Sequence, residues 1–441
     1  MIIAEELFDR IVALIQLDEH RAPEVTGMLY DTLKLACREA LSNNRELFGN
    51  LFSQVDYLSR KYSMHLRDVV AIQKMRSETR TGMQFSSKDL LSHARALSIF
   101  ISTIFQTAIP TRLNHLLPRV YYISKAKREI NYRRIRALVL SVQSDAFKVQ
   151  CEQFEDIKEM TVPLNEPHLL YLSTLLKEGM QVNLLDCNVE NDVIETALVV
   201  VNPDFLVDIS SIARCFTDWG HHPFSYTYNR LSPSANSKAI LLGHYSGVAL
   251  DDIINKKEHY SWQESLKKSF SKKALEYCTC GDMNVGDDFK YSAQQQSSNI
   301  QQIVNELFHS EKTSFDESKA ILEPSFICEE LGIQGRVDLM TTDFKLLIEQ
   351  KSGGNFNIER GIINKYGSYQ REDHYVQLLL YYGVLQHNFR LGRNDIDIRL
   401  LYSKYPLPGG LVVVAFYQQL FREAIEFRNR VVVNEIAVAQ Q

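Results

Sequence analysis

The sequence lacks the patterns of membrane, secreted and polycationic proteins. No apolar run approaches the roughly 18 residues that a membrane helix needs, and LVVVAFY near the C-terminus is typical of the longest. The first residues, MIIAEELFDR, carry acids and do not resemble a signal peptide. The formal net charge of −5 excludes a general polycationic coat for nucleic acid, although it permits a local basic groove. We therefore expect a cytoplasmic protein that does not enter a membrane.

Regularly spaced cysteines and nucleotide-binding motifs are also missing. The seven cysteines have no regular spacing, which is typical of reduced thiols. Cys278 and Cys280 form a CxC that could be half of a metal site. No second Cys or His pair stands at zinc-finger spacing, however, so free thiols are the favoured interpretation. The sequence contains no G-x-x-x-x-G-K-[ST], which excludes a P-loop ATP motor in this chain.

Hydrophobic periodicity divides the 441 residues into three predicted regions. Residues 1–133 repeat apolar residues every three and four positions, as in LFDRIVALIQL, which predicts an all-α domain. Residues 134–216 contain β-branched runs broken by Asn, Asp and Pro, which predict a small β-barrel; the oligonucleotide-binding (OB-like) type is one candidate. Residues 217–441 follow α/β order, and their first part, 217–238, gathers Gly, Pro and Ser as a linker does.

The stretch GRVDLMTTDFKLLIEQKSGG, residues 335–354, places charged residues in two predicted strands. Buried charges need a partner, a metal or a task. Glu349 and Lys351 share one face of their strand, and Asp338 on the preceding strand can approach Glu349 if the strands are neighbours. Two close carboxylates repel unless a cation lies between them, and hard oxygen ligands suit Mg²⁺ or Mn²⁺. The lysine makes phosphodiester hydrolysis the favoured chemistry, with a structural ion-pair network as the alternative.

This pattern resembles a known family. Asp338…Glu349-x-Lys351 is similar to the signature of the PD-(D/E)XK nucleases, and GRVD to its form in the RecB-like branch. Gln377-Leu-Leu-Leu-Tyr381 resembles the QxxxY helix that follows the lysine, and LSPSANSKAILLGHYSG resembles the opening helices of the domain. The resemblance implies an α/β nuclease core, a mixed sheet flanked by helices. It also implies that the catalytic residues are Asp338, Glu349, Lys351, Gln377 and Tyr381.

The resemblance further implies a divalent metal ion, Mg²⁺ or Mn²⁺, held by Asp338 and Glu349. Glu323, in LEPSF, stands where the family often has an acid on an earlier strand, and it is a candidate ligand. Some RecB-like nucleases also carry an iron–sulfur cluster, which uses three cysteines after the QxxxY helix. No cysteine follows Cys328, so we expect no such cluster here.

The opening motif departs from the family at its metal-binding histidine. Gly247-x-x-x reaches Asp251 where the family usually has histidine. Aspartate can still ligate Mg²⁺, so Asp251 is a candidate metal ligand. His244 and His309 are alternatives. Asp251 and Asp252 could instead form a solvated helix edge.

Basic and aromatic residues follow the charged stretch. Between Lys345 and Arg371 five Lys or Arg residues stand against two acids, with aromatic residues interleaved. Cations for phosphates and rings for bases suit single-stranded nucleic acid. SGGNFNIERGIINKYGSYQRED is also long enough for a mobile loop, and an ordinary surface loop is the alternative interpretation. The residues expected to bind DNA are Arg360, Lys365, Tyr366, Tyr369 and Arg371.

The resemblance extends over about 134–441. NDIDIRLLYSKYP and LFREAIEFRNRVVVNEIAVAQQ resemble the segment that joins such a nuclease to a superfamily 1 helicase in Okazaki-flap-type nuclease–helicases. The resemblance implies the front part of a longer nuclease–helicase, or a stand-alone relative of one. We therefore expect a Mg²⁺-dependent nuclease for single-stranded or flap DNA in replication, repair or phage defence. A catalytically inactive DNA-binding scaffold attached to a helicase is the alternative.

Overall fold

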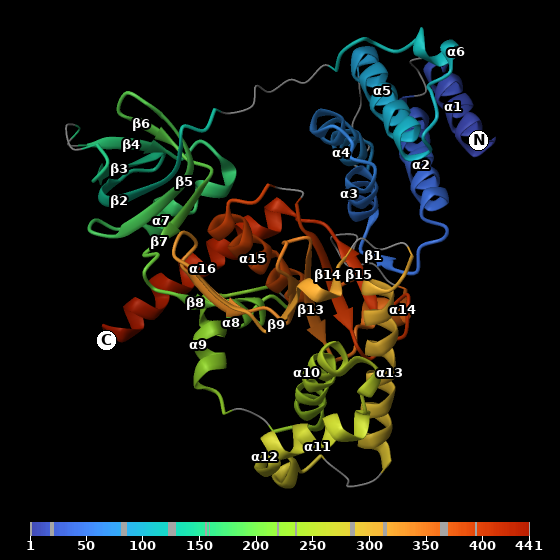
Figure 1. The fold of residues 1–441 in the computed structure, drawn as a ribbon. Coiled ribbons are helices and arrows are strands. Elements are labelled where there is room, and N and C mark those ends of the chain that lie inside the picture. Colours follow the sequence, from blue (N-terminus) through green and yellow to red (C-terminus); the bar gives the residue numbers. More distant parts are fainter. Residues whose placement is uncertain are drawn as a thin grey trace. The chain divides into compact units, whose positions relative to one another are not determined.

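The computed structural model groups the chain into two compact units (Figure 1). The first comprises Met1–Lys127, Lys365–Tyr369 and Val413–Ala415, and the second holds the remaining residues. The mixed α/β class is confirmed, and five strands close into a barrel. The structure describes residues 1–441 except residues 1, 18–21, 81–85, 122–128, 155–156, 158, 218–219, 234–235, 283–286, 312–314, 362–368, 393–394 and 441.

The first unit is helical. Two of its helices begin at capping residues, because the side-chain oxygens of Asn50 and Ser86 accept hydrogen bonds from the backbone N–H groups of Ser53 and Asp89. Phe100 is fully buried in the core that these helices share. The elements are α1 (Ile2–Ile15), α2 (Ala22–Ala40), β1 (Leu47–Phe48), α3 (Leu51–Lys61), α4 (Leu66–Arg80), α5 (Ser87–Ile104) and α6 (Thr111–Asn114).

The barrel begins the second unit. Ile135, Ala137 and Val139 are buried at every second position of β2, so one face of this strand lies in the barrel core. The strand order is β2-β3-β4-β6-β5-β7, and pairing of β2 with β5 closes the first five strands on themselves. The elements are β2 (Tyr132–Val142), β3 (Ala146–Cys151), β4 (Met160–Pro163), α7 (Leu172–Leu175), β5 (Gln181–Glu190), β6 (Val193–Glu195) and β7 (Leu198–Val201).

A mixed sheet carries the charged stretch. Its central strand β13 runs parallel to β14 and antiparallel to β12. Leu346 and Ile348 of β13 share a hydrophobic core with α10 and α13, whereas Glu349 accepts a hydrogen bond from Gln377 of α15. The elements are α10 (Lys238–Lys256), α13 (Asp287–Phe308), β9 (Ala320–Leu322), β12 (Leu339–Thr341), β13 (Leu346–Lys351), α15 (Glu372–Phe389), β14 (Asp397–Tyr402) and β15 (Leu411–Val414).

A smaller sheet, β10-β11-β8, lies in the same unit, and two expectations change around it. The segment 217–238, expected as a linker, contains helix α9, whose Thr227 Oγ1 donates to Glu435 Oε1 near the C-terminus over 2.6 Å. The segment 352–373, expected as a loop, contains helix α14 in its described part. The elements are β8 (Val207–Asp208), α8 (Ile209–Ala213), α9 (Pro223–Leu231), α11 (Trp262–Lys272), α12 (Ala274–Thr279), β10 (Ser325–Cys328), β11 (Ile333–Arg336) and α14 (Phe356–Arg360).

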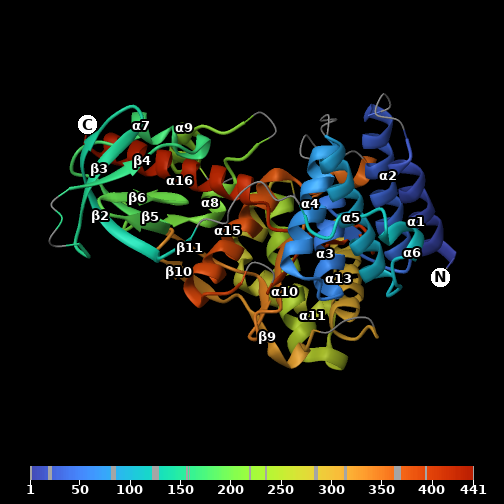
Figure 2. The same ribbon diagram turned by 90° about the horizontal axis from the view of Figure 1, so that it is seen from above.

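The C-terminal stretch is an integral part of this unit. Strand β14 forms a continuous parallel ladder with β13, from Leu346–Asp397 to Lys351–Tyr402. Helix α16 (Gln418–Ala439) packs on α9, α15 and β7, and Figure 2 shows it running beside the barrel strands. Within the part of the chain that the structure describes, no helix has the length and apolarity to cross a membrane.

Candidate active site

Strand pairing brings the two acids of the charged stretch together. Leu339 pairs with Ile348, so Asp338, just before β12, lies beside the end of β13. Asp338 Oδ2 accepts a hydrogen bond from the backbone N–H of Gln350 at 2.7 Å. Burial raises the pKa of Asp338, and the charge of Glu323 raises it further. The approach of Asp338 to Glu349 expected from the sequence is therefore present.

Glu349 is the centre of a closed hydrogen-bond network. Its Oε1 accepts from Lys351 Nζ at 2.9 Å and from Gln377 Nε2 at 2.7 Å, while Lys351 Nζ also donates to Gln377 Oε1 at 2.8 Å. Glu349 Oε2 is buried and has no hydrogen-bond donor among the described residues. Burial, followed by the charge of Asp338, raises the pKa of Glu349 to about 8. A carboxylate oxygen without a donor beside a second carboxylate can be satisfied by a shared proton or by a cation.

Tyr381 supports the site from behind. Its hydroxyl donates to the backbone carbonyl of Arg336 at 2.7 Å, one turn of α15 after Gln377. A Cβ at Gly335 would lie 2.8 Å from Tyr381 Cε1, so the strand can approach this ring only with glycine there. Gly335 of GRVD and Tyr381 of the QxxxY helix therefore pack directly against each other.

A pocket of about 630 Å³ opens beside these acids. Helix α10 contributes His244, Gly247 and Asp251, and the core contributes Asp338 and Lys351. A Cβ at Gly247 would meet nothing within 4 Å, so glycine here leaves the pocket open without being required by packing. The pocket is large enough for several atoms of a nucleotide backbone beside Asp338 and Lys351, whereas Glu349 is not among the residues that line it.

Asp251 and Glu323 both face this pocket, as their candidacy as ligands requires. Burial, followed by the charge of Glu323, raises the pKa of Asp251 to about 6. Glu323 has a φ of +51°, a conformation that costs a residue other than glycine about 1–3 kcal/mol. Its backbone N–H donates to Asp338 O at 3.0 Å, and its carboxylate pairs with Arg336 at 3.4 Å. The residue with the strained backbone, Glu323, is therefore the one that is hydrogen-bonded to the backbone of Asp338.

The structure distinguishes between the alternative metal ligands proposed for the opening motif, His244 and His309. His244 lines the pocket, whereas His309 lies 3.5 Å from Glu317 and is not among the lining residues. The interpretation of a solvated helix edge is wrong for Asp252. This side chain is buried, and it accepts hydrogen bonds from Ser265 Oγ at 2.6 Å and Lys268 Nζ at 2.7 Å. Asp252 therefore holds α11 against α10.

As they stand, no three His, Cys, Asp or Glu side chains in the described part of the chain are grouped so that they could hold a metal ion. The carboxylates of Asp338 and Glu349 nevertheless suit a hard cation, because Glu349 Oε2 lacks a donor and the two charges repel. Mg²⁺ keeps several waters and is commonly bound through only one or two carboxylates. Asp338 and Glu349 are therefore compatible with a bound Mg²⁺ ion, and Asp251 and Glu323 could supply further ligand oxygens.

The expected DNA-binding residues are only partly gathered at this pocket. Arg371 lines it and pairs with Asp373 at 2.7 Å. Arg360 is not among the lining residues, and its guanidinium lies over the Phe356 ring at 4.6 Å. Tyr369 is grouped with the first unit. Two further expected residues, Lys365 and Tyr366, lie outside the described residues.

Sequence reasoning missed several residues that line the pocket, among them Lys272, Lys273, Arg336 and His374. His374 Nδ1 lies 3.0 Å from the hydroxyl of Tyr402, and burial, followed by the charges of Lys351 and Arg371, lowers the pKa of His374 to about 2. His374 is therefore neutral. The sequence offered one indication of its position: His374 precedes Gln377 by three residues, so the two lie on one face of α15.

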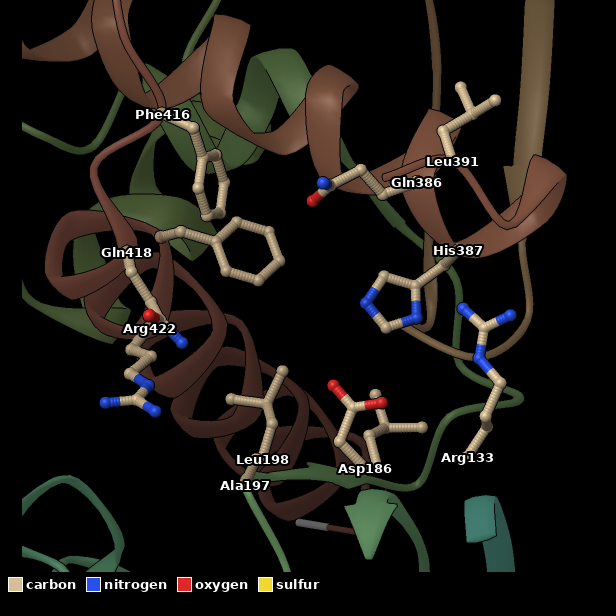
Figure 3. Close-up of a pocket in the computed structure, with 12 residues that line it drawn as sticks. Arg133, Asp186, Ala197, Leu198, Gln386, His387, Leu391, Phe416, Gln418 and Arg422 are labelled. Carbon is tan, nitrogen blue, oxygen red and sulfur yellow. The ribbon is translucent and has the colours of Figure 1, made fainter. Parts of the chain in front are cut away.

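A second, smaller pocket of about 170 Å³ lies between the barrel and helices α15 and α16 (Figure 3). Asp186 and Leu198 from the barrel face His387, Gln386 and Phe416. His387 Nδ1 lies 2.8 Å from Glu330, which keeps the histidine occupied. This pocket contains one carboxylate and no lysine, so the pocket beside β13 is the better candidate for chemistry.

Comparison with known proteins adds no name to this geometry: no family model and no curated protein sequence matches the chain. The arrangement itself defines a class of site, in which a buried carboxylate, a half-buried carboxylate and a lysine on two neighbouring strand segments lie beside an open pocket. The functional interpretation therefore depends on the residues.

Proposed function

We propose that this protein is a metal-dependent phosphodiesterase, and more particularly a DNA nuclease of the PD-(D/E)XK type and its RecB-like branch. The observation that carries this proposal is the network in which Lys351 bridges Glu349 and Gln377 beside Asp338. A structural ion pair needs no open pocket, whereas this one borders about 630 Å³. Single-stranded or flap DNA is the proposed substrate, because a single strand is narrower and more flexible than a duplex and can enter a pocket of this size.

The residues of the network divide the chemistry between them. Asp338 and Glu349 would hold Mg²⁺ or Mn²⁺, which lowers the pKa of bound water and neutralises charge that develops on a phosphoryl group. Lys351 would orient the attacking water or stabilise that charge, since its ammonium is fixed by two acceptors. Gln377 would hold Lys351 in place, and Tyr381 would hold the strand that leads into Asp338.

One observation favours a second candidate, an inactive DNA-binding scaffold. Glu349, Lys351 and Gln377 satisfy one another, so the network is stable without any metal ion. A scaffold, however, gives no reason for two acids with raised pKa values to lie next to an open pocket. Buried groups with perturbed pKa values in a cleft are typical of functional sites.

A cleavage assay tests the proposal. Labelled single-stranded, duplex and flap DNA are incubated with the protein in Mg²⁺, Mn²⁺ or EDTA, and products are resolved on denaturing gels. We expect metal-dependent cleavage that Asp338→Asn abolishes. Asp343→Asn is the matched control, because Asp343 lies on the turn of the same two strands and pairs with Lys319 at 3.2 Å. Intact DNA under every condition, with binding retained, would favour the scaffold.

A further inference from the structure

The cations around the large pocket differ in how they are neutralised. Lysine and arginine side chains line it at five positions: Lys272, Lys273, Arg336, Lys351 and Arg371. Four of them form ion pairs, with Glu276, Glu323, Glu349 and Asp373 respectively. Lys272 forms neither an ion pair nor a side-chain hydrogen bond within the part of the chain that the structure describes.

Lys272 is held at this place by the fold. It is the last residue of α11, one turn after Lys268, whose ammonium is bound by the buried carboxylate of Asp252 on α10. Ser269, on the same face of α11, is buried, lines the pocket and lies 2.9 Å from the hydroxyl of Tyr277. These contacts fix the rotation of α11, so that the pocket-facing side includes Lys272.

Lys272 is an exposed cation among the residues that line this pocket. Lys272 lines the pocket together with Asp251, yet the two form no ion pair in the described part of the chain. Favourable interaction with the C-terminal end of its own helix would explain a lysine here, but it would not explain why that lysine borders the pocket. A cation left without a partner beside an open cavity is available to a ligand carrying phosphate.

We propose that Lys272 binds one backbone phosphate of the substrate strand as it enters the pocket. This inference rests on the proposed nuclease function and adds a binding contact to it. Lys272 stands on α11, whereas Asp338 and Lys351 stand on the sheet, so the strand would be held between the two. Lys272 thereby contributes to substrate affinity, while Lys351 contributes to the rate.

Binding and cleavage measured on the full chain separate these roles. Binding to a labelled single-stranded oligonucleotide is measured in Ca²⁺ at several salt concentrations, with a gel confirming that the DNA stays intact. Lys272→Ala should weaken binding several-fold and flatten the slope of log K against log salt by about 0.7, the value for one phosphate contact on a single strand. Lys272→Arg should keep the slope, and the cleavage rate at saturating DNA in Mg²⁺ should be retained in both.

Lys267→Ala is the matched control, because Lys267 lies on the same helix, is exposed and does not line the pocket. It should leave affinity and slope unchanged. In a series of oligonucleotides, one phosphate at a time is replaced by a neutral methylphosphonate. At the position that Lys272 contacts, the wild type and Lys272→Ala should bind with equal affinity, because the charge that Lys272 recognises is gone. An unchanged slope in Lys272→Ala, or an equal loss in Lys267→Ala, would overturn this inference alone. Absence of cleavage by the wild type would overturn the proposed function, and a Lys272-dependent slope would still identify the phosphate contact.

Discussion

Gly335 shows how a single position ties the strand to the helix behind the site. A Cβ at this position would lie 2.8 Å from Tyr381 Cε1 and 3.3 Å from Ile209 Cβ, and both neighbours belong to buried side chains. Overpacking of this kind typically costs about 1–3 kcal/mol and is relieved by shifts of the backbone. Such a shift would move the carbonyl of Arg336 away from the Tyr381 hydroxyl. It would also displace Asp338, which lies only two residues further along the chain.

We therefore expect Gly335→Ala to lower both stability and cleavage. The free energy of unfolding should fall by about 1–3 kcal/mol, measured by urea denaturation. Cleavage should fall at temperatures at which the variant remains folded. Gly281→Ala is the control, since a Cβ there meets nothing within 4 Å. If Gly335→Ala is as stable as the wild type, the Tyr381 ring can move aside at no cost, and the proposed role of Gly335 is wrong.

The residues of the site were predictable where they depend on local geometry. Strand alternation places Glu349 and Lys351 on one face, and helical spacing places Gln377 and Tyr381 on another, so neither needs knowledge of the fold. Lys272 could not be found in this way. Its position depends on how α11 packs on α10 through Asp252, a long-range contact without a periodic signature.

Helix α16 contacts the β7 strand and the segments around it through buried polar side chains, of which Arg428 makes the most hydrogen bonds. Arg428 is fully buried, and its guanidinium donates to the backbone carbonyls of Gly332, Val201, Asn202 and Phe205. Gly332 lies in the turn between β10 and β11, Val201 ends β7, and Asn202 and Phe205 follow that strand. Burial lowers the pKa of Arg428 to about 9, so the guanidinium stays charged at neutral pH.

Loss of this side chain should destabilise the second unit strongly. Arg428→Met leaves buried carbonyls without donors, each at a cost of about 1–3 kcal/mol. The matched control is Arg430→Met, because Arg430 is partly exposed and its pair with Glu426 is worth at most about 1 kcal/mol. Urea denaturation of both variants measures the difference. Equal midpoints for Arg428→Met and the wild type would contradict this role.

Elements of the core were harder to predict than its motifs. The α9 segment reads as a linker because it gathers Gly, Pro and Ser, yet His222 caps the helix and Pro223 occupies its first turn. The β14 segment resembles a connector in sequence, but it is the parallel neighbour of the strand that carries Glu349 and Lys351. Parallel pairing joins distant segments, so a local pattern cannot reveal it.

Stability of the whole chain should depend on pH through the acids of the site. In the absence of divalent ions the folded state keeps Glu349 protonated up to a pKa of about 8, against an ordinary value of 4.5. The folded state therefore binds more protons than the unfolded state in this window, and stability falls as pH rises through it. Glu349→Gln should remove much of this fall, because the amide stays neutral.

Thermal unfolding in EDTA across this pH window tests that expectation. The melting temperature of the wild type should fall toward pH 8, and Mg²⁺ should restore part of it, because a ligand that binds only the folded state stabilises it. Glu349→Gln should melt higher than the wild type at pH 8 and respond less to Mg²⁺. Glu426→Gln is the control on an exposed pair. Parallel pH profiles for wild type and Glu349→Gln would contradict the linkage.

Lys351 gives the most direct test of the claim that this site hydrolyses phosphodiesters. Single-turnover cleavage of a labelled single strand in Mg²⁺ is compared for the wild type and Lys351→Ala, with binding constants measured in parallel. One electrostatic contact of this kind is commonly worth a factor of about 100–1,000 in rate. We predict a loss of that size in Lys351→Ala, with affinity changed only modestly. Cleavage by Lys351→Ala at the wild-type rate would contradict the catalytic assignment of the Asp338, Glu349 and Lys351 network.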